Sequence, residues 1–421
     1  MAELRLTPEE EAMLRGDEGP GVQKAMEIVA ALGRIYGAAD LVPVASVQIA
    51  GVSYKNLGDA GVEFLREWAR QGARVRVPTM LNPMGMEADR WQEMGISPDF
   101  ARPQLEVVRA FTQMGVIPTL SCTPYLLAYA PRAGDHLAWA ESSAVIFANS
   151  VLAARSNREG GPSALAAAIV GRTARYGLHL DQERRGTHWV EVRCPVRGVP
   201  DFGALGYLVG KGIAAGVPYF ADLAARLPPL PEDVTFGGEA GDSLKTMGAA
   251  MAAYGNIALY HIADYTPEAK EAGAALAPPS DAPRLVIDSL DAAYAVMDRD
   301  TDVRRIDLVS IGCPHASYNE LAQIADYLDG KRVKAGLWVT TARLTRERAA
   351  ADGLVQRIEA AGGHVVADTC TIVAPIQSLG IKAMATNAAK TACYAPSHSK
   401  VAVRYGSLER CLEAALTGEW K

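Results

Sequence analysis

Apolar residues in the first third of the chain follow two spacings in turn, and each spacing predicts a different element. Spacings of three and four residues place apolar side chains on one helical face, as Val62, Leu65 and Ala69 show. Short apolar runs and alternations predict strands instead. By these criteria we expect helices at 10–37, 59–70 and 104–114, and strands at 42–50, 73–77 and 116–120. Alternating strands and helices indicate a largely parallel α/β sheet.

The last third of the chain shows the same alternation more clearly. The pattern predicts strands at 306–311, 337–341 and 364–367, with helices at 318–328 and 345–361 between them. This order is a βαβαβ unit, which we expect to be a separate domain.

Proline clusters divide the region between these two parts. Residues 226–233 and 275–283 contain several prolines that break regular structure, and 247–258 between them predicts an apolar helix. Residues 138–174 are rich in Ala, Gly and Ser and predict closely packed helices. We therefore expect an N-terminal α/β region over 1–225, a linker and helical segment over 226–283, and a C-terminal α/β domain over 284–421.

Composition and charge narrow the class of protein. The 421 residues are 49% hydrophobic and 21% charged, which is typical of a globular chain and excludes a disordered or collagen-like one. The net charge of −6, with no block of Lys or Arg, argues against a nucleic-acid or membrane partner. No apolar run approaches the roughly 20 residues of a membrane span, and the N-terminus lacks the apolar core of a secretory signal. A cytoplasmic protein is expected.

Three of the six cysteines occupy positions that suggest chemistry. None forms a Cys-x-x-Cys pair, so zinc-ribbon, thioredoxin and ferredoxin-type patterns are absent. Cys122, Cys313 and Cys370 each follow a predicted strand, at the end where open α/β sheets gather their ligands. Three thiolates there could hold an iron–sulfur cluster with one iron left open; buried thiols or a catalytic cysteine are the alternatives. The remaining thiols are expected to be structural: Cys194, Cys393 and Cys411.

Polar residues gather in loops near these cysteines. The loop 50–61 is suited to hold an anion with backbone N–H groups, or is an ordinary glycine-rich turn. Asn82 is a polar residue in a second loop. Glu141 lies in an apolar stretch, so it is either paired or tuned for acid–base work. Arg158 and Lys390 either bind an anion or are paired or solvated. No HExxH or Ser-His-Asp pattern supports hydrolase chemistry.

Several ordered stretches are more specific than these isolated residues: AGVSYKNLGDAG (50–61), LNP (81–83), SCTPY (121–125), WAESSAV (139–145), ANSV (148–151), NREGGPSAL (157–165), YGLHL (176–180), IGCPHAS (311–317) and TN (386–387). Together they resemble the aconitase X family, and specifically its catalytic large subunit. The resemblance extends through nearly the whole chain, and so many ordered matches exclude chance agreement.

The resemblance implies a fold, a cofactor and a set of site residues. The fold would be an aconitase-like multi-domain α/β fold with parallel sheets and the cluster site between domains. The activity would be that of a hydro-lyase, which eliminates water from a hydroxylated acid. The implied cluster ligands are Cys122, Cys313 and Cys370, and the cluster is 4Fe–4S, with 2Fe–2S or a single iron as alternatives. The implied substrate contacts are Gly51, Val52, Ser53, Asn82, Pro83, Glu141, Ser142 and Lys390. Three of these contacts are also the candidate catalytic residues: Glu141, Ser142 and Lys390.

The family has two branches that differ in substrate. One dehydrates cis-3-hydroxy-L-proline, and the other, archaeal in type, converts mevalonate 5-phosphate to trans-anhydromevalonate 5-phosphate. The GVSYKN and NREGGP stretches resemble the second branch. The phosphate and carboxylate of its substrate would be held by the Gly51–Ser53 backbone, Asn82 and Lys390. One departure lies after Asn387, where the family usually has Ser-Gly-Lys and this chain has Ala-Ala-Lys390, followed by Cys393 where a ring is common. This difference would change the edge of the pocket, and a changed edge could mean a different substrate.

The resemblance also implies a partner. Aconitase-type enzymes close a small domain over the cluster, and in this family that domain supplies a serine as base. The 31 residues after Lys390 (421 − 390) are too few for such a domain. We therefore expect a separate small subunit, docking on a partly apolar cleft rimmed by Ser53, Asn82, Glu141 and the three cysteines. The rival hypothesis is a non-catalytic iron-binding or sensor subunit.

Overall fold

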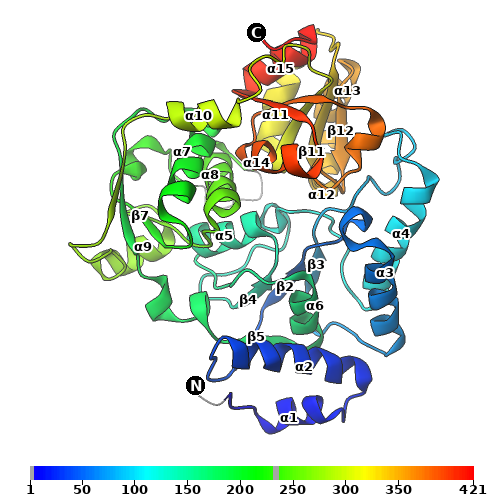
Figure 1. Cartoon of the computed structure of the whole chain (residues 1–421), viewed down its shortest axis with the longest axis vertical. Helices are drawn as coiled ribbons and strands as arrows, with labels where there is room; N and C mark the ends of the chain where they lie inside the picture. The colour runs from blue at the N-terminus through cyan, green and yellow to red at the C-terminus, as the bar shows by residue number, and fades with distance from the viewer. Residues whose placement is uncertain (1–3, 231–236) are drawn as a thin grey trace.

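A computed structural model of the chain describes residues 4–230 and 237–421 (Figure 1). The predicted proline cluster at 226–233 therefore lies partly outside the described residues. Three parallel sheets follow one another along the sequence, which confirms the predicted α/β class. Within the described residues, no helix is long and apolar enough to cross a membrane.

A three-stranded parallel sheet organises the N-terminal part, in the order β3-β2-β4. Its strands are β2 (Ser46–Ile49), β3 (Thr79–Leu81) and β4 (Leu137–Trp139). A short antiparallel pair contacts it: β1 (Leu41–Pro43) and β5 (Arg172–Ala174). The helices of this part are α1 (Pro8–Arg15), α2 (Pro20–Ile35), α3 (Tyr54–Arg70), α4 (Pro98–Gln113), α5 (Ser142–Val151) and α6 (Gly161–Val170).

The middle part is built on a four-stranded parallel sheet, in the order β8-β7-β6-β9. Its strands are β6 (His188–Val192), β7 (Pro218–Phe220), β8 (His261–Ile262) and β9 (Arg284–Ile287). Its helices are α7 (Gly198–Ile213), α8 (Glu239–Gly255), α9 (Pro267–Ala272) and α10 (Asp291–Met297). Helices α7 and α8 pack closely because glycines meet there: a Cβ on Gly255 would lie 2.2 Å from the carbonyl oxygen of Gly210.

A five-stranded parallel sheet forms the C-terminal part, in the order β12-β11-β10-β13-β14. Its strands are β10 (Leu308–Ala316), β11 (Gly336–Thr341), β12 (His364–Ala367), β13 (Ala383–Thr386) and β14 (Ala402–Tyr405). Its helices are α11 (Tyr318–Leu328), α12 (Arg343–Ala351), α13 (Leu354–Ala360), α14 (Ala389–His398) and α15 (Leu408–Thr417). The first three strands and their helices form the predicted βαβαβ unit.

Several predicted N-terminal elements differ from the structure. The helix predicted over 10–37 is two helices, because Gly16 ends α1 with a left-handed φ of 90° and Pro20 begins α2. The strand predicted over 42–50 is divided between two sheets as β1 and β2. The helix predicted over 59–70 begins earlier, at Tyr54, and the one predicted over 104–114 begins at Pro98.

Two predicted strands of this part are wrong. Residues 73–77 form no strand, and 116–120 contributes only one isolated bridge, between Ile117 and Met80. Pro118 has no N–H to donate to a ladder, and Leu120 adopts a left-handed φ of 46°, so the chain cannot continue as a regular strand there.

The C-terminal predictions agree better with the structure. The helix predicted over 318–328 and the strand predicted over 364–367 match α11 and β12. The helix predicted over 345–361 is divided into α12 and α13, because Gly353 has a left-handed φ of 77°. The middle sheet takes strands from both sides of residue 225, and the division at 225 and 283 stays a prediction.

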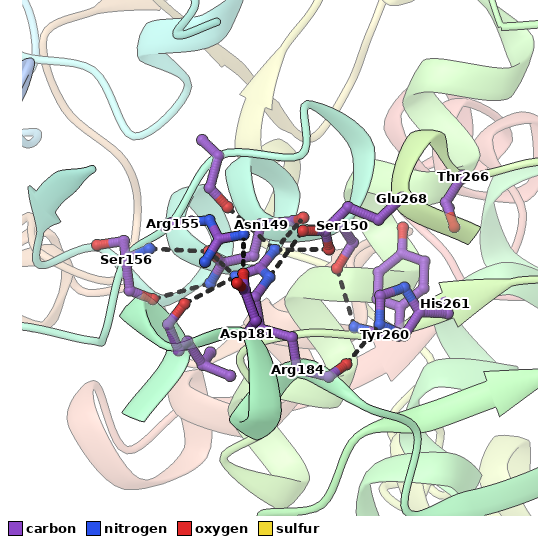
Figure 2. A network of polar contacts seen from close by, with 12 residues as sticks. Asn149, Ser150, Arg155, Ser156, Asp181, Arg184, Tyr260, His261, Thr266 and Glu268 are labelled. Atoms are coloured by element: carbon purple, nitrogen blue, oxygen red, sulfur yellow. Dashed lines mark hydrogen bonds and ion pairs between the residues drawn. The ribbon is translucent and has the colours of Figure 1, made fainter. Parts of the chain in front are cut away.

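A buried arginine links the N-terminal and middle parts. The side chain of Arg184 is 1% exposed and forms a two-point ion pair with Glu268 of α9, at 2.8 and 2.7 Å. Its other N–H groups donate to the carbonyls of Asn149, Ala154 and Leu178 at 3.1, 3.1 and 3.0 Å (Figure 2). The charge is therefore compensated, and the C-terminal end of α5 is held against α9.

Two histidines beside this arginine are expected to make the fold sensitive to acid. The Nδ1 atoms of His136 and His179 lie 2.9 Å apart, and His179 is buried. Burial lowers the pKa of His179 to about 3, and the charges of His136 and Arg184 act in the same direction.

We expect this shift to appear as acid destabilisation. The unfolded chain binds a proton at His179 near pH 6.5, whereas the folded chain binds it only near pH 3, so the free energy of unfolding falls as pH drops between these values. Between about pH 7 and 4.5 the loss through this residue should be roughly 2 kcal/mol. Urea unfolding at both pH values should show a smaller loss in His179→Gln and an unchanged loss in His364→Gln, an exposed control. Equal losses in wild type and His179→Gln would contradict this.

Candidate active site

One pocket of about 280 Å³ brings together nearly all the residues that the sequence singled out. The predicted residues that line it are Gly51, Val52, Asn82, Pro83, Cys122, Glu141, Ser142, Cys313, Cys370 and Lys390. They come from the N-terminal and C-terminal parts of the chain, so the pocket lies where these parts meet.

The two sheets explain why these distant residues meet. Gly51, Asn82 and Glu141 follow the carboxyl ends of β2, β3 and β4, and Cys370 and Lys390 follow those of β12 and β13. Carboxyl ends of parallel strands share one edge, which is where open α/β sheets bind ligands. Two such edges face the same pocket.

Two of the cysteines reach the pocket differently from the prediction. Cys122 does not follow a strand; its loop is held by the N–H of Ser121, which donates to the Leu81 carbonyl at 2.9 Å, and by Gln48, which donates to the Ser121 carbonyl at 3.0 Å. Cys313 lies inside β10, where the pairing with β11 is interrupted between Ile311 and Ala316. That irregularity releases the thiol from the regular ladder.

Glu141 is at the centre of a charge network on the pocket wall. Its carboxylate pairs with the Lys390 ammonium and accepts from Asn82 Nδ2 at 2.8 Å and from Ser143 Oγ at 3.1 Å. Burial alone would raise the pKa of Glu141, but Lys390 and the hydrogen bonds lower it to about 2. Burial opposes the charge of Lys390 likewise, yet the Glu141 carboxylate raises its pKa. Of the two hypotheses for Glu141, the structure therefore favours a paired carboxylate.

The three pocket thiols are buried or nearly so. Burial raises the pKa of Cys122 and Cys313 above the usual range and that of Cys370 to about 12. Such thiols stay protonated unless a cation binds, because a metal's charge reverses this preference. The Cys122 sulfur already accepts from the His315 N–H at 3.2 Å. In the described part of the chain, no three His, Cys, Asp or Glu side chains are close enough together to hold a single metal ion.

Ser53 is placed behind the pocket wall. Its side chain is fully buried, and its hydroxyl donates to the Val373 carbonyl at 2.9 Å. Lys55 donates to the neighbouring carbonyls of Ile372 and Ala374 at 3.3 and 3.4 Å. These contacts fasten the loop after β2 to the loop that carries Cys370.

The pocket also contains residues that the sequence analysis did not select. Tyr394 and His398 line it from α14, Asn56 lines it from the first turn of α3, and Val373 lines it from the loop that carries Cys370. Lys390, Tyr394 and His398 are four residues apart, so helical spacing from Lys390 is a signal that would have found both. Cys393, which stands where the family commonly has a ring, does not line the pocket, but the adjacent Tyr394 ring does.

Known proteins match nearly the whole chain. Family models for the first, second and third domains of aconitase X match residues 3–182, 186–296 and 306–417. The chain belongs to the aconitase X family. The holo-form structure of Thermococcus kodakaraensis aconitase X superposes with a TM-score of 0.86 at 44% identity, covering 98% of this chain and 100% of that one.

Among aconitase X relatives, two named activities occur. The phosphomevalonate dehydratase large subunit of Methanothermobacter thermautotrophicus is 46% identical over 388 residues, 92% of each chain. That of Methanocaldococcus jannaschii is 44% identical, over 97% of this chain and all of its own length. A cis-3-hydroxy-L-proline dehydratase from Pseudomonas aeruginosa is 34% identical over 98% of this chain, which spans 70% of that protein.

Proposed function

We propose that this chain is the catalytic large subunit of a phosphomevalonate dehydratase, which converts (R)-5-phosphomevalonate to trans-anhydromevalonate 5-phosphate. In this elimination a C–O and a neighbouring C–H bond break, a C=C bond forms, and hydroxide and proton leave as water. The observation that carries the proposal is the higher identity to large subunits of that name, 46% and 44%, than to the hydroxyproline dehydratase, 34%.

Three thiols that line one pocket support an iron–sulfur cofactor. Cys122, Cys313 and Cys370 would hold the cluster, with 4Fe–4S as the first choice and 2Fe–2S as the alternative. A single iron does not suit their spacing in the described residues. When bound, a cluster with an open iron supplies a Lewis acid for the departing hydroxyl. The fit rests on the donor set: soft sulfur ligands converge from three separate segments, and one already receives a backbone hydrogen bond.

The charges of the pocket support Arg158 as the binding group for the substrate phosphate. Lys390 is neutralised by Glu141, and Asn82 is bonded to the same carboxylate, so neither offers an uncompensated charge. Arg158 lines the same pocket and is exposed; its one hydrogen bond in the described residues runs from Nη1 to Asn256 Oδ1 at 3.3 Å. Because a doubly charged phosphate needs a free cation, Arg158 is its anchor, beside the backbone at Gly51.

This assignment leaves Glu141, Lys390 and Ser142 at the reacting end of the substrate. Glu141 fixes the direction of the Lys390 ammonium, which also reaches Ser142 Oγ at 3.4 Å. Lys390 and Asn82 therefore hold the substrate carboxylate by hydrogen bonds whose geometry Glu141 sets, and a preset geometry saves the entropy of orienting these groups.

Replacing Arg158 is the direct test of the substrate. Arg158→Met should raise KM for 5-phosphomevalonate about 10- to 100-fold and leave kcat within a few-fold, because one charge-assisted contact contributes about 1.5–3 kcal/mol to binding. Arg34→Met, an exposed arginine at the end of α2, is the matched control and should change neither constant.

Steady-state assays of the complete complex with both candidate substrates would also reveal any result that contradicts the proposal. An unchanged KM in Arg158→Met would contradict the phosphate anchor. Turnover of cis-3-hydroxy-L-proline in place of 5-phosphomevalonate would contradict the proposed substrate. A complex that binds iron and dehydrates neither would support the sensor hypothesis.

A further inference from the structure

His315 contacts the loops of all three pocket thiols although it does not line the pocket itself. It lies on β10 two residues after Cys313 and is fully buried. Its backbone N–H donates to Cys122 Sγ at 3.2 Å. Its ring reaches Ser121 Oγ through Nδ1 at 3.2 Å and the Thr369 carbonyl through Nε2 at 3.0 Å. Thr369 directly precedes Cys370, so one residue connects three segments that are far apart in sequence.

The hydrogen-bond network allows a single orientation of this ring. A carbonyl oxygen only accepts, so Nε2 carries the hydrogen and donates to Thr369. Nδ1 is then an acceptor, and the Ser121 hydroxyl must donate to it. Ser121 Oγ in turn accepts from the Thr123 N–H at 3.1 Å. Both ring nitrogens are therefore engaged, one toward the Cys122 loop and one toward the Cys370 loop.

The backbone of His315 is anchored from a third side. Its carbonyl accepts from the buried ammonium of Lys245 at 3.2 Å, and Lys245 pairs with Asp242 at 3.2 Å and with Glu320. Lys245 and Asp242 belong to α8 of the middle part. The strand segment after Cys313 is thus held from both neighbouring parts of the molecule, at a point where the β10–β11 ladder is interrupted.

We propose that His315 is a positioning residue that sets the distances between the three cysteine sulfurs and so determines how firmly the iron–sulfur cluster is held. The inference rests on the proposed cofactor but not on the substrate. Partners in the shell around metal ligands commonly change metal affinity 10- to 100-fold when they are removed. His315 acts in this way on three ligands at once.

The test compares cluster loss in two buried-histidine variants of the complete complex. His315→Ala should lose its visible absorbance to an iron chelator, under anaerobic conditions, at least about tenfold faster than wild type. His261→Ala is the matched control: His261 is also fully buried and bonds a carbonyl through Nε2, that of Arg184 at 2.8 Å (Figure 2), and neither residue lines the pocket of the thiols. Its cluster should be lost at the wild-type rate. The urea unfolding midpoints of both variants measure the loss of stability that removal of any buried imidazole causes.

Conservative variants keep the proposal falsifiable if His315→Ala does not fold. Ser121→Ala removes the donor to Nδ1 together with the contacts of Ser121 Oγ to Thr123, and His315→Gln retains a donor that can reach the Thr369 carbonyl. Both should lose the cluster faster than wild type but more slowly than His315→Ala, which has neither ring link. Equal rates in His315→Ala and His261→Ala, or wild-type rates in Ser121→Ala, would overturn the positioning role.

These outcomes are distinct from a failure of the proposed function. A wild-type complex that binds the cluster and dehydrates no substrate would contradict the function, while the comparison of rates would still decide the role of His315. A wild-type complex that takes up no iron after anaerobic reconstitution would overturn both the cofactor and this role.

Discussion

Cys313→Ala is expected to abolish iron binding. Cys313 and the other two thiols line one pocket from three separate segments, and a cluster that loses one of three protein ligands has two attachment points left. After anaerobic reconstitution, wild-type protein should be brown with a broad visible band. The variant should be colourless and should retain less than about a tenth of the iron, because ligand loss exceeds the 10- to 100-fold effects of outer-shell changes. Chemical analysis of iron and sulfide in both proteins measures how much of the cluster each retains.

The control for the cysteine variants is a buried cysteine outside the pocket. Cys194→Ser fits, because Cys194 is 8% exposed, as Cys122 is, and does not line the pocket. It should keep full colour and iron. A brown Cys313→Ala protein, or a wild type that binds no iron, would refute the assigned ligand set. If Cys122→Ala and Cys370→Ala bleach while Cys313→Ala does not, a different third ligand holds the cluster.

Local pattern predicted the C-terminal part of the fold well and the N-terminal part less well, for physical reasons. The strands of the βαβαβ unit, such as 364–367, are continuous apolar runs between amphipathic helices, so their periodicity is decisive. The three-stranded sheet is made of strands as short as Thr79–Leu81, which are too brief to show a period. Residues 73–77 alternate like a strand, but the N–H groups of Val75 and Arg76 donate to Met114 and Ala168, outside any sheet. Tertiary contacts, and not local alternation, therefore determine the conformation of residues 73–77.

The residues that make up the site could be predicted, but the ion pairs and hydrogen bonds among them could not. The rule that ligands gather at strand ends brought Cys122, Cys313 and Cys370 into one set, and they do share a pocket, although Cys122 follows no strand and Cys313 lies inside β10. Which cation pairs with which carboxylate depends on side chains that are hundreds of residues apart, such as Lys390 and Glu141. For that reason neither the ion pair of Lys390 with Glu141 nor the lack of a carboxylate partner for Arg158 among the described residues could be predicted. The link from Ser53 to Val373 was hidden in the same way.

The isolated large subunit is expected to be nearly inactive, with kcat at least about 10²- to 10⁴-fold below that of its complex with a small subunit, which is the contribution of a missing general base. Glu141 is not poised for that role, because Lys390 holds it ionised with a pKa of about 2, which makes it a weak base. The mouth of the pocket is also open, because Gly51, Asn56, Arg158 and His398 are exposed. Exclusion of water from the reaction requires a cover.

Chain lengths among the relatives point the same way. This chain spans 92% and 100% of two relatives named as large subunits, but 70% and 69% of two cis-3-hydroxy-L-proline dehydratases. We infer that the additional segment of those longer proteins does in one chain what a separate subunit does here. The exposed residues around the pocket mouth would then become part of a permanent interface, and a stable interface of this kind buries more than about 1,200 Å² in total.

Turnover of 5-phosphomevalonate by the large subunit alone, and then with the small subunit of the same organism added, measures the effect. The isolated chain should still bind iron and 5-phosphomevalonate, because the thiols, Arg158 and Lys390 all belong to it; this separates a missing base from a misfolded site. Addition of the small subunit should restore kcat and change KM much less. The reason is that the partner would supply the base, which acts in the transition state, and would not supply the group that binds the substrate phosphate. Full activity of the isolated chain would place the base within it, with Glu141 as the first candidate. Glu141→Gln would then have to remove that activity, and the two-subunit hypothesis would be wrong.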